Sequence, residues 1–127
     1  MPDRSGRARP HVLIVEDEVF VGLELSEILR DAGYEPVGPA SDVASAQTLL
    51  KRSLPDFAVL DVNLEGRTSA PIALTLKQQG IPFLYRSGYT ADYVREHLPA
   101  AEILLKPVAP TLLIAAIRSA LDAARRG

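Results

Sequence analysis

The chain has 127 residues, of which 47% are hydrophobic and 24% charged, a length and composition that favour one compact domain. It contains no cysteine, which excludes a disulfide framework, a thiolate metal site and a thiol nucleophile, and two histidines argue against a histidine-rich zinc site. A formal net charge of −2 argues against a general nucleic-acid binder.

The first ten residues differ in composition from the rest of the chain. Residues 1–10 carry three arginines among Pro, Ser and Gly, which predicts a disordered leader before a domain over 11–127. This segment has no apolar core and is therefore no secretory signal. No apolar run approaches the ~20 residues of a membrane span, so we expect a cytoplasmic chain without a membrane segment.

Four short apolar runs predict buried strands of a parallel sheet. They lie at residues 11–15, 57–60, 82–86 and 102–105, and polar residues follow each of them. A weaker extended segment at 35–39 contains two prolines, which favour an edge strand over a central one.

Helical patterns alternate with these strands. Apolar residues recur at helical spacing through 21–32, 43–50, 72–77 and 113–124, and a short helix is expected over 91–98. Residue types suited to helix ends flank these segments, namely Gly33, Ser41, Asp42, Pro71, Gly80 and Thr90. The alternation predicts an α/β fold with a parallel sheet and helices on both of its faces.

The residues that end the strands carry the chemistry. Glu16 and Asp17 follow the first strand, Asp61 ends the third, Ser87 the fourth and Lys106 the fifth. Functional groups of an open parallel sheet gather at the carboxyl ends of its strands, so these side chains should converge. Three clustered carboxylates need a cation, and oxygen ligands without Cys or His favour Mg²⁺. A carboxylate between that ion and a lysine is placed to attack phosphorus.

Four segments, in order and each at a strand end, resemble the receiver domain of two-component response regulators. The resemblance covers residues 11 to about 124 and rests on V-L-I-V-E-D-E at 12–18, P-D-F-A-V-L-D-V-N-L at 55–64, S-G-Y at 87–89 and L-L-K-P at 104–107. It implies a doubly wound, flavodoxin-like sheet of five parallel strands in the order 2-1-3-4-5.

The same resemblance implies a role for each site residue. Asp61 is the phosphoacceptor, Lys106 pairs with a phosphoryl oxygen, and the Ser87 hydroxyl reaches toward the bound phosphoryl group. The Lys106–Pro107 bond is typically cis in this family. The implied protein ligands of Mg²⁺ are Glu16, Asp17, Asp61 and the main-chain carbonyl of Asn63.

Each of these residues also has a purely structural interpretation that stays open. Glu16 and Asp17 are placed to stabilise the start of the following helix. Asp61 is a potential ion-pair partner without chemistry, and Ser87 and Asn63 suit turns.

Two positions depart from the receiver pattern. Many receivers carry Phe or Tyr where this chain has Ile103, so a ring that rotates on phosphorylation is missing. Residues 82–89 resemble the P-F-x-F-A-T-G-[YG] signature of the FAT GUY receivers, with Arg86 in place of its alanine. That subgroup implies a stand-alone regulator whose phosphodonor is a histidine kinase, often of the HWE group, or a phosphotransfer protein.

The resemblance also implies a surface for output. We expect Tyr89 and Asn63 to flank the entrance to the phosphoryl group and to influence its hydrolysis. The partner face would comprise residues 91–98, 102–105 and 110–124, with 91–98 mobile and a separate downstream protein as target. The sequence leaves the oligomeric state open, a homodimer included.

The leading hypothesis is a phosphoaccepting signalling domain, not an enzyme, with Mg²⁺ as its ion. One alternative is a degenerate receiver that acts as a phosphorylation-independent scaffold. A less favoured one is a small aspartate-nucleophile phosphatase, since Asn63 stands where a general acid is needed. A flavodoxin-like FMN binder is disfavoured because Glu16, Asp17 and Glu18 would repel a phosphate.

Overall fold

A computed structural model describes residues 8–126, so the leader expected over 1–10 lies largely outside the described residues. The described chain alternates strands and helices, with one extra pair of two-residue strands. In order these are β1 (His11–Val15), α1 (Val19–Asp31), β2 (Glu35–Ala40), α2 (Val43–Arg52), β3 (Phe57–Asp61), β4 (Asn63–Leu64), β5 (Arg67–Thr68), α3 (Ala70–Gln78), β6 (Phe83–Ser87), α4 (Ala91–His97), β7 (Glu102–Leu105) and α5 (Pro110–Arg126).

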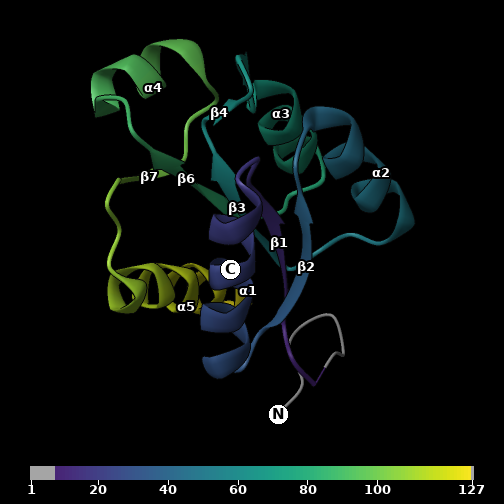
Figure 1. Ribbon diagram of the computed structural model, residues 1–127. Helices are drawn as coiled ribbons and strands as arrows, with labels where there is room; N and C mark the ends of the chain where they lie inside the picture. The colour runs from purple at the N-terminus through teal and green to yellow at the C-terminus, as the bar shows by residue number, and fades with distance from the viewer. Residues whose placement is uncertain (1–7, 127) are drawn as a thin grey trace.

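The main sheet has five parallel strands in the order β2-β1-β3-β6-β7 (Figure 1). This is the doubly wound arrangement predicted from the sequence, and the proline-containing β2 is an edge strand as expected. The chain winds outward from β1 to β2 in one direction and from β3 to β7 in the other. A crevice therefore opens beside the carboxyl ends of β1 and β3, where ligands of such folds bind.

Two apolar layers hold the sheet between its helices, with α1 and α5 on one face and α2 and α3 on the other (Figure 1). Each strand buries alternate side chains on opposite faces, so β1 contributes to both layers. The α1–α5 layer includes Ile14, Leu29 and Ile117, and the opposite layer includes Leu13 and Ile72. All five side chains are fully buried, which explains the continuous apolar runs of the strands.

Most of the predicted helix ends are confirmed. The Asp42 carboxylate accepts a hydrogen bond from the Ser45 N–H, and the Thr90 hydroxyl accepts one from the Tyr93 N–H. Pro71 lies in the first turn of α3. Gly33 follows α1 with a φ of 96°, a conformation that glycine adopts without a steric penalty. No helix within residues 8–126 is both long and apolar enough to cross a bilayer.

The β4–β5 hairpin was not predicted from the sequence. Asn63 and Leu64 pair antiparallel with Thr68 and Arg67, and the intervening Glu65 and Gly66 both have positive φ, at 50° and 86°. A two-residue type I′ turn requires positive φ at both central residues. Gly66 was the one residue here that indicated such a turn. Glu65 obscured that signal because residues other than glycine seldom adopt this conformation.

Two glycines of similar φ differ in the space around them. A Cβ added at Gly38 (φ 91°) would lie 2.7 Å from the Ala40 nitrogen and 2.9 Å from the Ile14 carbonyl oxygen. At Gly33 (φ 96°) it would meet no atom within 4 Å. We expect Gly38→Ala to lower the free energy of unfolding by about 3 kcal/mol and Gly33→Ala by about 1 kcal/mol, in urea titrations. Equal losses of unfolding free energy in the two variants would show that backbone φ alone, and not the space around the Cβ, sets the cost of substitution at both glycines.

Candidate functional site

Three carboxylates converge at the carboxyl ends of β1 and β3. Glu16 and Asp17 follow β1, Asp61 ends β3, and one carboxylate oxygen of each residue lies within 4.8 Å of the other two. Glu16 and Asp61 are 2% and 6% exposed, and Asp17 is partly exposed. The convergence follows from the topology, because β1 and β3 are neighbours although 45 or so positions separate their acidic residues.

Two cationic side chains contact this acidic cluster. Lys106, which follows β7, places Nζ 2.8 Å from Oδ1 of Asp61. Arg86, in β6, places Nη1 3.0 Å from Oε1 of Glu16. The Lys106–Pro107 bond is cis, as the resemblance implied. The Arg86 contact was not foreseen, although a charged residue inside an otherwise buried strand was a signal for it.

An open cavity of about 320 Å³ lies above the cluster. Asn63 and Tyr89, which were expected to flank the entrance, both line it. Glu16 and Ser87 are buried and are not among its lining residues. The lining residues are Asp17, Glu18, Asp61, Val62, Asn63, Gly88, Tyr89 and Lys106.

Ser87 is held by the loop that follows it. Its hydroxyl donates a hydrogen bond of 3.1 Å to the Tyr89 carbonyl oxygen and accepts one of 2.9 Å from the Tyr89 N–H. The Tyr89 ring stacks on Tyr93 at 4.6 Å, and Tyr93 stacks on His97 at 4.2 Å, so a column of rings runs along α4. The Ser87 hydroxyl therefore contacts the Tyr89 main chain, and the Tyr89 ring contacts α4.

Burial dominates the electrostatics of Glu16. It raises the pKa of this carboxyl above its ordinary value, and the neighbouring Asp61 charge adds to the rise. The Glu18 N–H, which donates to Oε2 at 3.1 Å, and the Lys106 charge oppose it. The Arg86 guanidinium, at 3.0 Å, likewise favours the ionised form, so we describe Arg86–Glu16 as an ion pair.

The donor set of the cluster fits a hard divalent cation. It offers oxygen atoms only, and two cations face three carboxylates, which leaves one negative charge uncompensated among the described residues. The Asp17 carboxylate instead accepts a hydrogen bond of 3.0 Å from the Glu65 N–H, which ties the β4–β5 turn to the site. Asp17 and Asp61 both reach the cavity, as Mg²⁺ ligands must.

Ile103 lies away from the cavity. It is the register partner of Tyr85 in the neighbouring strand, is half-buried, and packs against the core on the α2–α3 side of the sheet. The Tyr85 ring is fully buried and its hydroxyl donates to the Pro99 carbonyl oxygen at 2.6 Å. Tyr85 is thus a core side chain, and Ile103 packs at the edge of the core.

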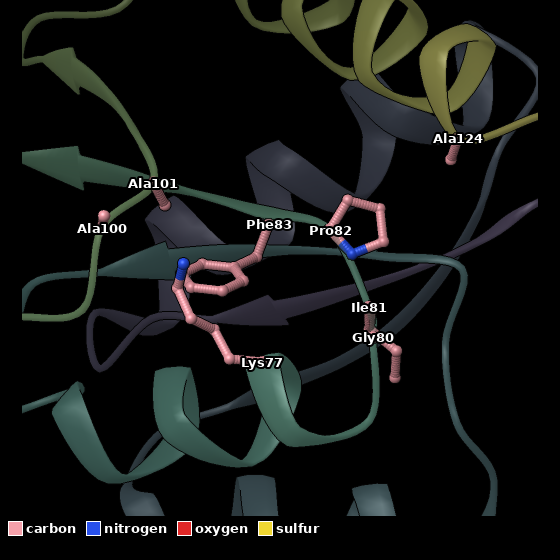
Figure 2. Close-up of a pocket in the computed structure, with 8 residues that line it drawn as sticks. All are labelled: Lys77, Gly80, Ile81, Pro82, Phe83, Ala100, Ala101 and Ala124. Atoms are coloured by element: carbon pink, nitrogen blue, oxygen red, sulfur yellow. The ribbon is translucent and has the colours of Figure 1, made fainter. Parts of the chain in front are cut away.

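A second hollow lies at the opposite end of the sheet (Figure 2). Figure 2 shows the Lys77 side chain beside the Phe83 ring, with Pro82 and Ala124 across the opening. This cavity of about 430 Å³ has no acidic residue in its lining. It therefore lacks the groups for metal or phosphoryl chemistry, and the acidic cluster remains the candidate site.

The sheet order and the acidic cluster at its switch point define a doubly wound α/β domain with an acidic crevice. Comparison with known proteins specifies the family. Residues 12–118 match the response regulator receiver domain family, and the chain belongs to that family, a component of two-component signalling. Such domains are typically non-enzymatic signalling modules.

Two curated relatives illustrate the match. The chain is 33% identical to the transcriptional regulatory protein PdtaR of Mycobacterium tuberculosis over 124 residues, 94% of this chain and 60% of PdtaR. It is 29% identical to the aerobic respiration control protein ArcA of Escherichia coli over 117 residues, 89% of this chain and 49% of ArcA. The chain thus spans about half to three fifths of the length of these relatives.

Solved structures support the fold. A response regulator receiver protein from Sinorhizobium medicae superposes with a TM-score of 0.81 at 27% identity, covering 91% of this chain and 96% of the other. The receiver domain of the response regulator PhyR from Erythrobacter litoralis also gives 0.81, at 21% identity, with 91% and 92% covered.

Asp17 is the carboxylate without a cationic partner among the described residues, so its charge should contribute most to cation binding. We expect Asp17→Asn to raise the Kd for Mg²⁺ by roughly tenfold or more, measured by titration calorimetry at constant ionic strength. Asp92→Asn removes the same charge from an exposed pair with Arg95 and should leave the Kd unchanged. Equal Kd values in all three proteins would remove Asp17 from the metal site.

Proposed function

We propose that this receiver accepts a phosphoryl group on Asp61, in a Mg²⁺-dependent reaction, and then signals to a separate protein by a change of conformation. The observation that carries the proposal is the position of Asp61. Its carboxylate lies in the floor of an open cavity, 2.8 Å from the Lys106 ammonium and close to two further carboxylates. The donor is a histidine kinase or a phosphotransfer protein, since phosphohistidine is the donor that two-component systems use.

The transfer uses Asp61 as an oxygen nucleophile. A carboxylate oxygen forms a bond to phosphorus while the bond between phosphorus and the donor imidazole nitrogen breaks, and the imidazole keeps the electron pair and takes a proton. Lys106 is placed to pair with a phosphoryl oxygen as negative charge arrives at Asp61. Asp17, Asp61 and the Asn63 carbonyl, with Glu16 as the further acidic residue of the implied set, would hold Mg²⁺, which would supply positive charge for the phosphoryl oxygens.

Ser87 supplies a route from chemistry to conformation. Its hydroxyl is bound to the Tyr89 main chain at 2.9 and 3.1 Å, and we propose that it exchanges these bonds for one to the phosphoryl group. The 87–90 loop and the stacked rings of α4 would then move together. Because Ile103 has no ring to rotate, the α4 side is the route that remains.

The subgroup and the partner face belong to the same proposal. The P-F-L-Y-R-S-G-Y segment at 82–89 supports a FAT GUY-like receiver served by an HWE-type kinase. Output would pass through α4, β7 and α5, with Tyr89 and Asn63 at the cavity rim setting the access of water. The scaffold alternative is favoured by one observation, the half-buried aliphatic Ile103 at the position where many receivers carry an aromatic ring.

Acetyl phosphate and Mg²⁺ test the chemistry directly. We expect the wild-type protein to gain the mass of one phosphoryl group, lost again on standing, because acyl phosphates hydrolyse. Asp61→Asn keeps the size of the side chain but removes the nucleophile, and should show no adduct by intact-mass spectrometry. A wild-type protein that stays unmodified with every small-molecule donor and with kinase would support the scaffold alternative.

The start of α1 presents apolar side chains next to the cavity. Val19, Phe20 and Leu23 are 67%, 86% and 52% exposed, just after the cavity residue Glu18. We propose that they contact the phosphodonor protein, which must bring its phosphohistidine to Asp61.

Substitution at this surface should separate the two kinds of donor. Phe20→Asp is expected to slow transfer from a histidine kinase by about tenfold or more, as loss of an aromatic anchor does, and to leave acetyl phosphate labelling unchanged. Leu74→Asp, at a 52% exposed position of α3 on the opposite side of the sheet, serves as the matched control. Equal slowing by both variants would place the donor elsewhere.

A further inference from the structure

Arg86 is a charged residue at an interior position of β6, between the fully buried Tyr85 and Ser87. Its side chain is 12% exposed and donates from Nη1 to Oε1 of Glu16 at 3.0 Å, and the Glu16 side chain is 1% exposed. The ion pair is therefore shielded from water. In such a buried position the attraction between opposite charges is much stronger than at the surface.

The sheet brings this pair next to the phosphoacceptor position. Arg86 is the register partner of Asp61, and β3 lies between β6 and β1, so the guanidinium spans the width of β3 to contact Glu16. The second carboxylate oxygen of Glu16 accepts the Glu18 N–H at 3.1 Å. Both oxygens of Glu16 are thus engaged, and Glu16 does not line the cavity that Asp17 and Asp61 share.

The pair changes the charge that a cation meets at this site. Three carboxylates would carry three negative charges, of which Lys106 compensates one at Asp61. Arg86 compensates a second at Glu16. A divalent ion then meets one net negative charge in place of two, because the guanidinium repels the ion as the carboxylates attract it.

We propose that Arg86 is a positioning residue that holds Glu16 back from the cavity and lowers the affinity of the site for Mg²⁺. The guanidinium and the ion are both attracted to the Glu16 carboxylate, and they compete for it. The ion pair therefore stabilises the metal-free receiver relative to the metal-bound form. The inference concerns Mg²⁺ binding alone. It rests on the proposed function only for the purpose of that binding, which is phosphorylation of Asp61.

The test measures Mg²⁺ binding in mildly alkaline buffer at constant ionic strength. Arg86→Ala should lower the Kd for Mg²⁺ on the order of tenfold, because the ion then relieves a buried carboxylate that has lost its partner. The rise in Tm on adding saturating Mg²⁺ should also be larger than in the wild type, although the metal-free Tm falls.

Two further variants separate charge from packing. Arg86→Lys keeps the charge and should keep the Kd within about threefold of the wild-type value, because an ammonium near Glu16 still repels the ion. Arg95→Ala removes an equal charge from the exposed pair with Asp92 and should not change the Kd. If Arg86→Ala is unfolded without metal, Arg86→Gln replaces it, with the same expected gain in affinity.

The outcomes distinguish this inference from the proposed function. Unchanged or weaker Mg²⁺ binding in Arg86→Ala or Arg86→Gln overturns the role of Arg86, even if Asp61 is phosphorylated normally. A Kd that also falls about tenfold in Arg86→Lys overturns it as well, since charge would then be irrelevant. Absence of any adduct on the wild-type protein refutes the proposed function and leaves the comparison of Kd values intact.

Discussion

The mutual repulsion of three carboxylates at one end of the sheet is the constraint on which the rest of the site depends. Glu16 and Asp61 are almost fully buried, and isolated charges in such places would destabilise the fold. Two strands beyond β3 each supply a cation, Lys106 after β7 and Arg86 within β6. The carboxylates thus lie at the ends of β1 and β3, and the two cations that compensate them come from the next strands of the sheet, β6 and β7.

That compensation explains the division of the site into two layers. Asp17 and Asp61 face the cavity, while Glu16 and Ser87 lie behind it and are held by hydrogen bonds. In the proposed function, the residues that face the cavity bind the ion and the phosphoryl group, and Ser87 responds to them. Both sets of residues lie at the carboxyl ends of the neighbouring strands β1, β3 and β6.

The sequence predicted the architecture because apolar periodicity and turn residues act locally. The five main strands, the flanking helices and the edge position of β2 are confirmed, with β6 shifted by one residue so that Ser87 ends the strand. The charged Arg86 inside a buried strand indicated that it has a partner, but that the partner is Glu16 depends on which strands are neighbours, and no local pattern encodes this. The β4–β5 hairpin was missed because Glu65 adopts a φ that its side chain type rarely allows.

The column of stacked rings along α4 gives the molecule an optical property. The chain has four tyrosines and no tryptophan, so tyrosine dominates its intrinsic ultraviolet emission. Tyr89 lies at the cavity rim and stacks on Tyr93, whereas Tyr85 is enclosed in the core. A movement of the 87–90 loop would alter the stacking of the Tyr89 and Tyr93 rings. Tyrosine emission is therefore a label-free signal for any movement of this loop.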